Sequence, residues 1–239
     1  MAFTIKLKSR KEIAAETMAF HFEKPPGFTS TAGQCGDFTL PNPPETDAEG
    51  NVRSFTLASA PFEEDLMIAT RMRDTAFKRS LKTVPLGTEL ILEAPWGELI
   101  LHDDAHIPAV FLTGGIGITP VRSMVLQATH DHLPHKLTLF YANHRPEDAA
   151  FLDELTAART ANPNFTLVAT MSDMEKSAAQ WDGETGHVSK AMLAKYIVDL
   201  TLPIYYISGP PGMVAAMQKT LSDAGVKTSN IRAEEFSGY

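Results

Sequence analysis

The pattern of hydrophobic and polar residues changes near residue 104. Before this point, short runs of alternating apolar and polar residues are separated by proline, glycine and acidic residues, which is typical of β-strands joined by turns. We expect six strands, at residues 3–7, 18–22, 37–40, 53–57, 66–71 and 88–92. Short strands at this spacing predict an antiparallel six-stranded β-barrel, because a closed barrel leaves no strand edge unpaired.

After residue 104, apolar runs alternate with helical patterns. The apolar runs predict five strands, at residues 109–113, 136–141, 166–170, 204–208 and 231–235. Helical patterns lie at residues 121–129, 147–160, 190–198 and 214–224, and a shorter one at 75–81 belongs to the first half. This alternation predicts an α/β domain with a five-stranded parallel sheet covered on both faces. We therefore expect two domains, residues 1–104 and 105–239.

Composition narrows the function classes. The chain has 21 basic and 29 acidic residues, a formal net charge of −8, and no basic run, so nucleic acid is a poor candidate partner. No apolar stretch approaches the length of a membrane span, and the first residues lack a signal-peptide core. We expect a cytoplasmic protein.

Cysteine and histidine provide little chemistry. Cys35 is the only cysteine, which excludes internal disulfides and an iron–sulfur cluster held by four cysteines of this chain. With no histidine nearby, a buried strand residue is favoured over a reactive thiol. His130, His132 and His135 stand in a proline-containing segment that is typical of a polar surface loop, and we expect no metal site.

A glycine-rich turn follows the first apolar run of the second half. Gly114, Gly115 and Gly117 precede Pro120, which suits a first helical position. Glycines allow positive φ and let another molecule approach the backbone, while the N–H groups at a helix start attract phosphate. The alternative is a tight strand-to-helix loop with no ligand.

A second candidate site lies at residues 53–56. Strand alternation puts Arg53 and Phe55 on one face and Ser54 and Thr56 on the other. An arginine can bind a diphosphate through its planar fork, an aromatic ring can stack on a flat heterocycle, and a hydroxyl can reach a ring nitrogen. An ordinary strand with alternating exposure remains the alternative.

Residues 53–56 resemble the Arg-x-Tyr-Ser/Thr flavin signature of the ferredoxin–NADP reductase superfamily, with Phe55 in the tyrosine position. Gly33-Gln34 and the stretch from Gly87 to Gly97 also fall at that family's barrel landmarks. Residues 205–213 resemble its Cys-Gly-Pro-Pro-x-Met element, with Ser208 in place of cysteine. The resemblance spans essentially the whole chain and implies an FAD-binding barrel, a nicotinamide-binding α/β domain and no iron–sulfur domain.

The resemblance implies roles at the flavin. Arg53 is expected on the flavin phosphates, Phe55 over one face of the isoalloxazine and Thr56 near N5. The family usually has a glycine followed by a serine or threonine at the helix predicted at 75–81, and this chain lacks them. The backbone N–H groups at the start of the helix can still bind a second phosphate. FAD is therefore favoured over FMN. A solvated basic face is the competing account of Lys78 and Arg79. The expected FAD residues are Arg53, Ser54, Phe55, Thr56, Thr70, Arg71, Phe77, Lys78, Arg79, Ser80, Thr119, Phe236 and Tyr239.

The nicotinamide nucleotide is expected beyond the carboxyl ends of the parallel strands, where such sheets bind ligands. The expected residues are Gly114, Gly115, Gly117, Thr119, Pro120, Asn143, His144, Arg145, Asp173, Ser208, Gly209, Pro210, Pro211 and Met213. Where NADPH-specific relatives commonly have Ser-Arg, this chain has Ser172-Asp173. A carboxylate repels a 2′-phosphate, so NADH is favoured over NADPH, although Arg145 could supply a cation.

The implied reaction is hydride transfer from NAD(P)H to FAD, followed by passage of electrons to a separate acceptor. Thr56, Thr119, Ser208 and Glu235 are the expected catalytic residues, with Glu235 steadying the reduced ring and Phe236 or Tyr239 shielding it. Ferredoxin, flavodoxin, an oxygenase component or a small oxidant is the expected acceptor. The alternative is an FAD-binding regulatory or electron-transfer subunit of a larger complex with slow NAD(P)H turnover. A non-enzymatic barrel that binds another ligand also remains open.

Overall fold

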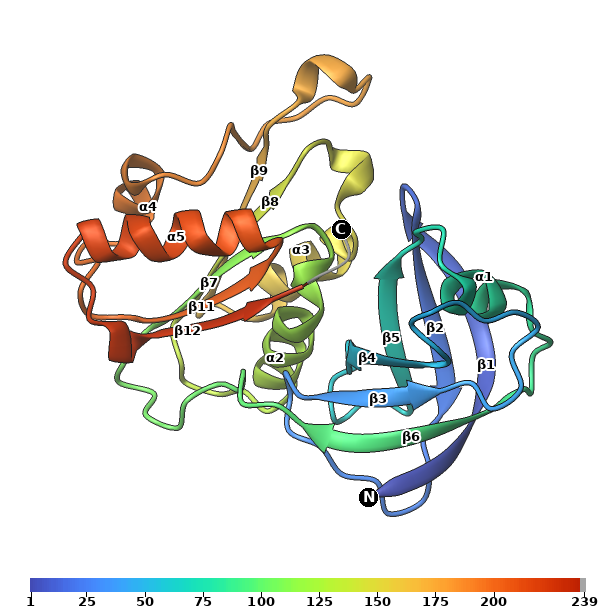
Figure 1. The fold of residues 1–239 in the computed structure, drawn as a ribbon. Helices are drawn as coiled ribbons and strands as arrows, with labels where there is room; N and C mark the ends of the chain where they lie inside the picture. Colours follow the sequence, from blue (N-terminus) through green and yellow to red (C-terminus); the bar gives the residue numbers. More distant parts are fainter. Residues whose placement is uncertain (237–239) are drawn as a thin grey trace.

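The protein consists of two β-sheets that lie side by side, each with its own helices (Figure 1). The structure is a computed structural model, and it describes residues 1–236. The first sheet has the strand order β4-β3-β6-β1-β2-β5, and its pairings are antiparallel. Its elements are β1 (Ala2–Ala14), β2 (Thr17–Glu23), β3 (Cys35–Thr39), β4 (Val52–Thr56), β5 (Asp65–Arg71), α1 (Ala76–Thr83) and β6 (Glu89–Trp96). Because the sheet curls until its end strands β4 and β5 lie close together, it forms the predicted barrel.

Alternating apolar residues fill the barrel. In β6, Leu90, Leu92 and Ala94 point inward between exposed neighbours. Phe77 of helix α1 joins the same core cluster, which also contains the side chains of β2 and β3. Strand β1 continues well past the apolar run at residues 3–7, because its polar continuation pairs with β2 through the backbone and leaves no hydrophobic pattern to read.

The second sheet is parallel, with the order β10-β9-β8-β7-β11-β12. Its strands are β7 (Ala109–Gly114), β8 (Leu137–Asn143), β9 (Phe165–Met171), β10 (Glu184–Thr185), β11 (Ile204–Gly209) and β12 (Ile231–Glu235). The predicted parallel sheet is confirmed, but the count of five strands is wrong. The sixth, β10, has two residues that pair with the end of β9, and such a short polar segment carries no periodicity.

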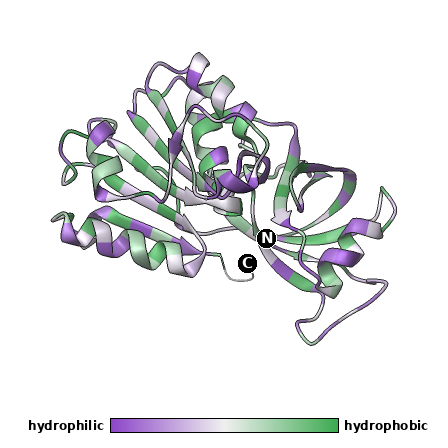
Figure 2. Cartoon of the chain, turned by 90° about the horizontal axis from the view of Figure 1, so that it is seen from above, coloured by the Kyte–Doolittle hydropathy of each residue, from purple (hydrophilic) through white to green (hydrophobic). Residues whose placement is uncertain are grey.

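Helices cover both faces of this sheet. They are α2 (Ile118–His130), α3 (Leu152–Ala161), α4 (Lys190–Tyr196) and α5 (Pro211–Asp223). Phe111 packs in the core cluster that includes residues of α2 and α3, whereas Val110 and Leu112 pack in the cluster that includes residues of α4 and α5. Figure 2 shows that these helices carry hydrophobic and hydrophilic residues together, as expected for a surface layer.

The helix predicted at residues 147–160 is broken in the structure. A 3₁₀ turn spans Pro146–Asp148, and α3 begins only at Leu152. Between them Phe151 adopts φ +61°, a conformation incompatible with a continuous helix, while its side chain is buried. Burial of this aromatic ring therefore outweighs the local helical pattern.

The chain crosses from one sheet to the other over residues 97–108, and we retain residue 104 as the proposed domain boundary. Within residues 1–236, no helix is both long enough and apolar enough to traverse a bilayer.

Candidate functional site

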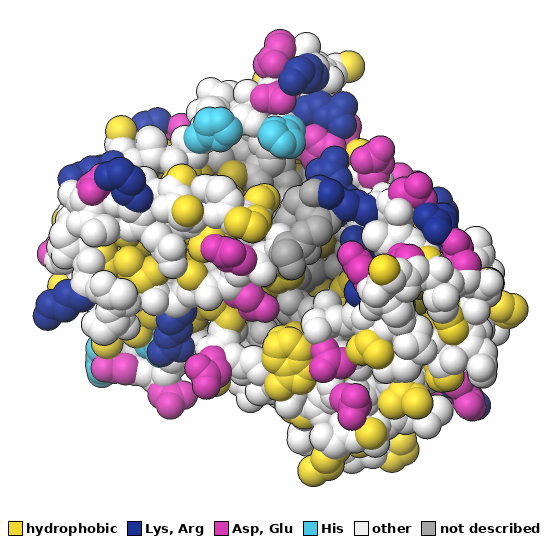
Figure 3. Space-filling model, in the orientation of Figure 1, with side chains coloured by type: hydrophobic (Ala, Val, Ile, Leu, Met, Phe, Trp, Pro, Cys, Tyr) yellow, Lys and Arg dark blue, Asp and Glu magenta, His cyan; other side chains and the backbone are white. Residues whose placement is uncertain are grey.

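Two neighbouring cavities lie where the barrel meets the parallel sheet. The barrel cavity, of about 740 Å³, is walled by β4, β5, the start of α1 and the glycine-rich turn. The sheet cavity, of about 430 Å³, lies at the carboxyl ends of β7 and β8 and at the start of α5. Arg71 and Ile116 line both, so the two cavities adjoin. In Figure 3, basic side chains and two histidines lie around the hollow between the two halves.

The barrel cavity has an aromatic and hydroxyl wall. Phe55 is half-buried and packs its ring 5.9 Å from those of Phe38 and Phe77. Thr56 and Thr119, both buried, line the same cavity from opposite domains. The Thr119 hydroxyl donates to the Ile116 carbonyl at 3.1 Å. A flat ligand stacked on Phe55 would therefore also face the glycine-rich turn.

Basic side chains dominate the charge of this cavity. Among residues 1–236, Arg53, Arg71, Arg73 and Lys78 line it, together with one carboxylate, that of Glu49. The Lys78 ammonium donates to the Arg71 carbonyl at 2.8 Å. Burial, and then the positive charges of Arg73 and Arg53, lower the pKa of Lys78 to about 8. This concentration of cations favours an anionic ligand.

The glycine-rich turn packs too tightly for larger residues. A Cβ on Gly117 would lie 2.4 Å from the Ser208 carbonyl oxygen, and one on Gly114 would lie 2.4 Å from Met213 Sδ. Helix α2 begins at Ile118 after a 3₁₀ turn, so Pro120 is its third residue and not its first as predicted. The first-turn N–H groups have no intrahelical acceptor, so proline is still tolerated there.

The sheet cavity contains a buried amide with no protein partner. Neither polar atom of the Asn143 side chain has a hydrogen-bond partner within residues 1–236, although the side chain lines the cavity. Buried polar groups are normally paired, so this amide is a ready contact for a polar ligand. Six of the nicotinamide residues expected from the sequence line this cavity: Gly114, Gly115, Asn143, His144, Pro210 and Met213.

Other expected nicotinamide residues are placed differently. The Ser208 hydroxyl is fully buried and donates to the Gly117 carbonyl at 2.7 Å, so it fixes the turn. Arg145 pairs with Asp148 through two hydrogen bonds of 3.0 and 2.8 Å. Gly209, which takes φ +156°, is the last residue of β11, and Pro211 is the first residue of α5. His187, which sequence reasoning missed, also lines the cavity; it follows β10, a strand without a sequence signal.

Asp173 lies beside the rim of the sheet cavity. Its carboxylate is 2.9 Å from the Lys176 ammonium and 3.6 Å from His144 Nδ1. The hydrogen bond from Lys176 is the main reason why the pKa of Asp173 is below its ordinary value, so the group is anionic at neutral pH. Ser172 and His144, which are hydrogen-bonded to each other, line the cavity itself.

Three expected flavin residues on α1 point away from the barrel cavity. Phe77 is buried in the barrel core, and the Ser80 hydroxyl is buried and donates to the Glu45 carbonyl at 3.4 Å. The exposed Arg79 guanidinium pairs with the carboxylates of Glu45 and Asp74. Thr70, by contrast, is buried and lines the cavity next to Arg71.

The C-terminal strand brings a different acid inward from the one expected. Glu235 is exposed, whereas its neighbour Glu234 is half-buried and burial raises its pKa. Phe236 lines the barrel cavity and its N–H donates to the Gly209 carbonyl at 2.9 Å. Tyr239 lies outside the described residues. Adjacent strand residues face opposite sides, so the expectation of Glu235 named the neighbour of the residue that faces inward.

Cys35 is buried at the start of β3, as expected. Its sulfur contacts the Trp96 carbonyl at 3.3 Å. Burial, and then the charge of Glu234, raise the pKa of the thiol to about 12, so it is not a nucleophile at neutral pH.

Known proteins share this arrangement. Residues 111–219 match the family model of the oxidoreductase NAD-binding domain. The F subunit of the Na(+)-translocating NADH-quinone reductase of Actinobacillus succinogenes is 29% identical over 203 residues, 78% of this chain and 49% of the relative. The ferredoxin NADP+ reductase of Neisseria gonorrhoeae, solved with bound FAD and NADP, superposes with a TM-score of 0.79 at 20% identity, covering 98% of each chain.

The described residues therefore share the two-domain fold of this ferredoxin NADP+ reductase. A further neighbour has the same fold: the flavohem-like FAD/NAD-binding domain of nitric oxide dioxygenase from Vibrio cholerae gives a TM-score of 0.82 at 19% identity over 98% of both chains. The chain spans about half the length of the curated relatives it matches. The family match supports a nicotinamide nucleotide as a ligand of the parallel-sheet domain.

The residues that line the barrel cavity fit a flavin in part. The aromatic wall at Phe55 and the cations Arg71, Arg73 and Lys78 suit a ring and a phosphate. Two expected phosphate donors, however, are already engaged. The Ala76 N–H at the start of α1 donates to Asp47 at 2.9 Å, and the Arg53 guanidinium lies 2.8 Å from Glu49.

Proposed function

We propose that this chain is a flavin-dependent oxidoreductase that transfers hydride from a dihydronicotinamide nucleotide to FAD and then passes electrons to a separate acceptor. The observation that carries the proposal is the pair of adjoining cavities. One is lined by Phe55 and Thr56 of the barrel, the other by the glycine-rich turn of the parallel sheet, and Arg71 borders both. Two reacting rings could therefore meet between the domains.

Bound FAD would supply the redox chemistry, and the chain would bind and align the reactants. Phe55 offers a stacking surface, Thr56 and Thr119 offer hydroxyl groups near the ring, and Phe236 covers another side of the cavity. Arg71, Arg73 and Lys78 neutralise phosphate charge. Ser208 acts indirectly, since its hydrogen bond holds the Gly117 carbonyl. The other expected residues keep their roles in this proposal, except Phe77, Arg79 and Ser80, which point away from the barrel cavity.

Glu234 replaces Glu235 as the proposed acid near the flavin. Its half-buried position near Cys35 and the raised pKa that burial causes suit a group that can hold a proton. The exposed Glu235 lacks both properties.

The preferred nucleotide is proposed to be NADH. The anionic Asp173 would repel a 2′-phosphate and can accept hydrogen bonds from ribose hydroxyl groups. Arg145 is the cation that could bind a 2′-phosphate, but its guanidinium already pairs with Asp148. Lys176 partly offsets the charge of Asp173, so we expect a preference and not an absolute exclusion.

The acceptor is proposed to be a separate protein, reached on the cytoplasmic side. The matched relatives are named as subunits of an NADH-quinone reductase, which favours the second candidate, an electron-transfer subunit of a larger complex. The two candidates differ in the rate at which NADH reduces the isolated chain.

Anaerobic stopped-flow reduction of the FAD-loaded protein tests the proposal. We expect rapid bleaching of the oxidised flavin band with NADH and slower bleaching with NADPH. Slow reduction by both nucleotides would favour the subunit role. Failure of the purified chain to bind FAD, or of bound FAD to react with either nucleotide, would refute hydride transfer.

A further inference from the structure

The loop between β3 and β4 places carboxylates on groups that would bind a flavin phosphate. Asp47 accepts a hydrogen bond from the Ala76 N–H at 2.9 Å, and its other oxygen lies 3.4 Å from the Arg53 guanidinium. Glu49 lies 2.8 Å from the same guanidinium. The Arg53 side chain is only 17% exposed, and one of its nitrogens donates to the carbonyls of Glu49, Gly50 and Val52.

These contacts satisfy the same donors that an anion would use. A helix N-terminus and an arginine fork both bind phosphate and carboxylate oxygens in the same way. Helix α1 begins with Ala76, and the Thr75 hydroxyl accepts from the N–H of Lys78, the third residue of the helix. Asp47 thus takes the first N–H group of the helix. The Ala76 N–H, and more weakly Arg53, keep the pKa of Asp47 below its ordinary value, so the group is charged at neutral pH.

Of the other cations of the cavity, Arg71 lies 3.5 Å from the Glu16 carboxylate, whereas Arg73 and Lys78 have no carboxylate partner among residues 1–236. Arg73 is exposed and lines the cavity, and the Lys78 ammonium donates to a backbone carbonyl. A phosphate that enters the cavity is attracted by these groups and is repelled by Asp47 and Glu49, which keep Arg53 and the start of α1 occupied.

We propose that Asp47, assisted by Glu49, competes with the flavin phosphate for Arg53 and the Ala76 N–H, and so limits the affinity of this chain for phosphorylated flavins. The inference rests on the proposed flavin function and goes beyond it by identifying residues that oppose cofactor binding. Removing the competing charge should therefore tighten binding, whereas removal of an ordinary binding residue weakens it. The effect should require a phosphate on the ligand.

The test compares Asp47→Asn with wild type in equilibrium titrations of FAD, FMN and riboflavin, followed by flavin fluorescence. The amide can still accept from the Ala76 N–H, so the helix cap survives; Asp47→Ala is a second variant, and thermal unfolding monitors both. We expect both variants to bind FAD and FMN on the order of tenfold more tightly, about the effect of one charge-assisted hydrogen bond. Riboflavin, which has no phosphate, should bind all forms equally.

Glu45→Gln is the matched control. Glu45 belongs to the same loop and the substitution changes the net charge equally, but its carboxylate pairs with the exposed Arg79. This variant should bind all three flavins as wild type does. Equal tightening in Glu45→Gln would indicate a long-range charge effect and overturn the inference, as would unchanged or weaker FAD binding in folded Asp47→Asn.

The outcomes separate this inference from the proposed function. If NADH reduces wild type rapidly but Asp47→Asn does not tighten FAD, only the inference fails. If the variant tightens FAD but NADH reduces neither form, only the proposed hydride transfer fails. If none of the proteins binds a flavin, both fail.

Discussion

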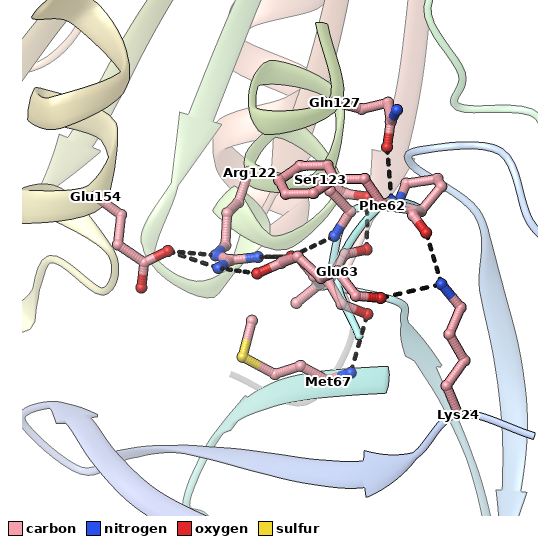
Figure 4. A network of polar contacts seen from close by, with 12 residues as sticks. Lys24, Phe62, Glu63, Met67, Arg122, Ser123, Gln127 and Glu154 are labelled. Carbon is pink, nitrogen blue, oxygen red and sulfur yellow. Dashed lines mark hydrogen bonds and ion pairs between the residues drawn. The ribbon is translucent and has the colours of Figure 1, made fainter. Parts of the chain in front are cut away.

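The guanidinium of Arg122 forms a two-point ion pair with the carboxylate of Glu63, with nitrogen–oxygen distances of 2.8 and 3.0 Å (Figure 4). Arg122 lies on α2, one turn after the glycine-rich turn, and Glu63 lies in the loop between β4 and β5. Arg122 also donates to the Ala58 carbonyl at 2.7 Å and pairs with Glu154. One buried side chain thus joins the barrel to the helices of the parallel-sheet domain.

Replacing Arg122 should destabilise the protein strongly. In Arg122→Met the Glu63 carboxylate keeps its half-buried position without its cation, so the free energy of unfolding should fall by about 3–5 kcal/mol. Chemical denaturation measures this change. Lys219→Met is the control, since the exposed Lys219–Asp223 pair should contribute about 0.2–1 kcal/mol. Similarly small losses of unfolding free energy in both variants would show that the interdomain ion pair stabilises the protein no more than an exposed one.

Asn143 should matter for the nucleotide and not for folding. In Asn143→Leu the buried, unpartnered amide disappears, so the melting temperature should stay level or rise. If a nucleotide satisfies that amide, the Kd for NADH should rise on the order of tenfold, the loss of about one hydrogen bond. Thermal unfolding and NADH titration measure the two effects. An unchanged NADH Kd, with FAD binding also unchanged, would remove Asn143 from the site.

The strands of both domains were predictable because their residues alternate or are uniformly apolar. Val110, Phe111 and Leu112 form a continuous apolar run since both faces of a parallel sheet are covered. Two sequence motifs, residues 53–56 and the glycine-rich turn, predicted the two walls of the barrel cavity, and the structure brings them together there.

The rest depended on contacts between distant residues. Asp47 stands in a polar loop, and only the fold brings its carboxylate to the Ala76 N–H, 29 positions away. His187 reaches the sheet cavity behind β10, whose two residues have no readable period. Which of Glu234 and Glu235 faces inward follows from the pairing of β12 with β11. The sequence does not show it, because a strand that ends in two acidic residues has no alternation of apolar and polar residues there.

Two glycines of the nucleotide half should respond to alanine with opposite signs. In Gly117→Ala the new Cβ would lie 2.4 Å from the Ser208 carbonyl, so the backbone must shift and the protein should lose about 1–3 kcal/mol. At Gly212, in helix α5, a new Cβ would have no atom within 4 Å, and alanine there should gain about 0.5–1 kcal/mol. Denaturation midpoints measure both. Equal tolerance at the two positions would contradict the tight packing of the turn.

Lys78 should make flavin binding depend on pH in the alkaline range. The pKa of this lysine is lowered to about 8, mainly by burial, so the free protein loses this positive charge as the pH rises through that value. If the ammonium contacts a flavin phosphate, FAD should bind most tightly below about pH 8, with the Kd rising above it. Titrations across this range measure the effect, and riboflavin should show no such dependence.

The stability effect of Lys78 has the opposite sign. Because the folded pKa lies below the ordinary value of 10.5, the unfolded chain binds more protons between these two values, and the free energy of unfolding should increase with pH across that window. Lys78→Met should abolish both the alkaline loss of FAD affinity and this rise in stability, while Lys82→Met, on the same helix, should retain them. A pH profile of FAD binding that is identical in Lys78→Met and wild type would place the phosphate away from this ammonium.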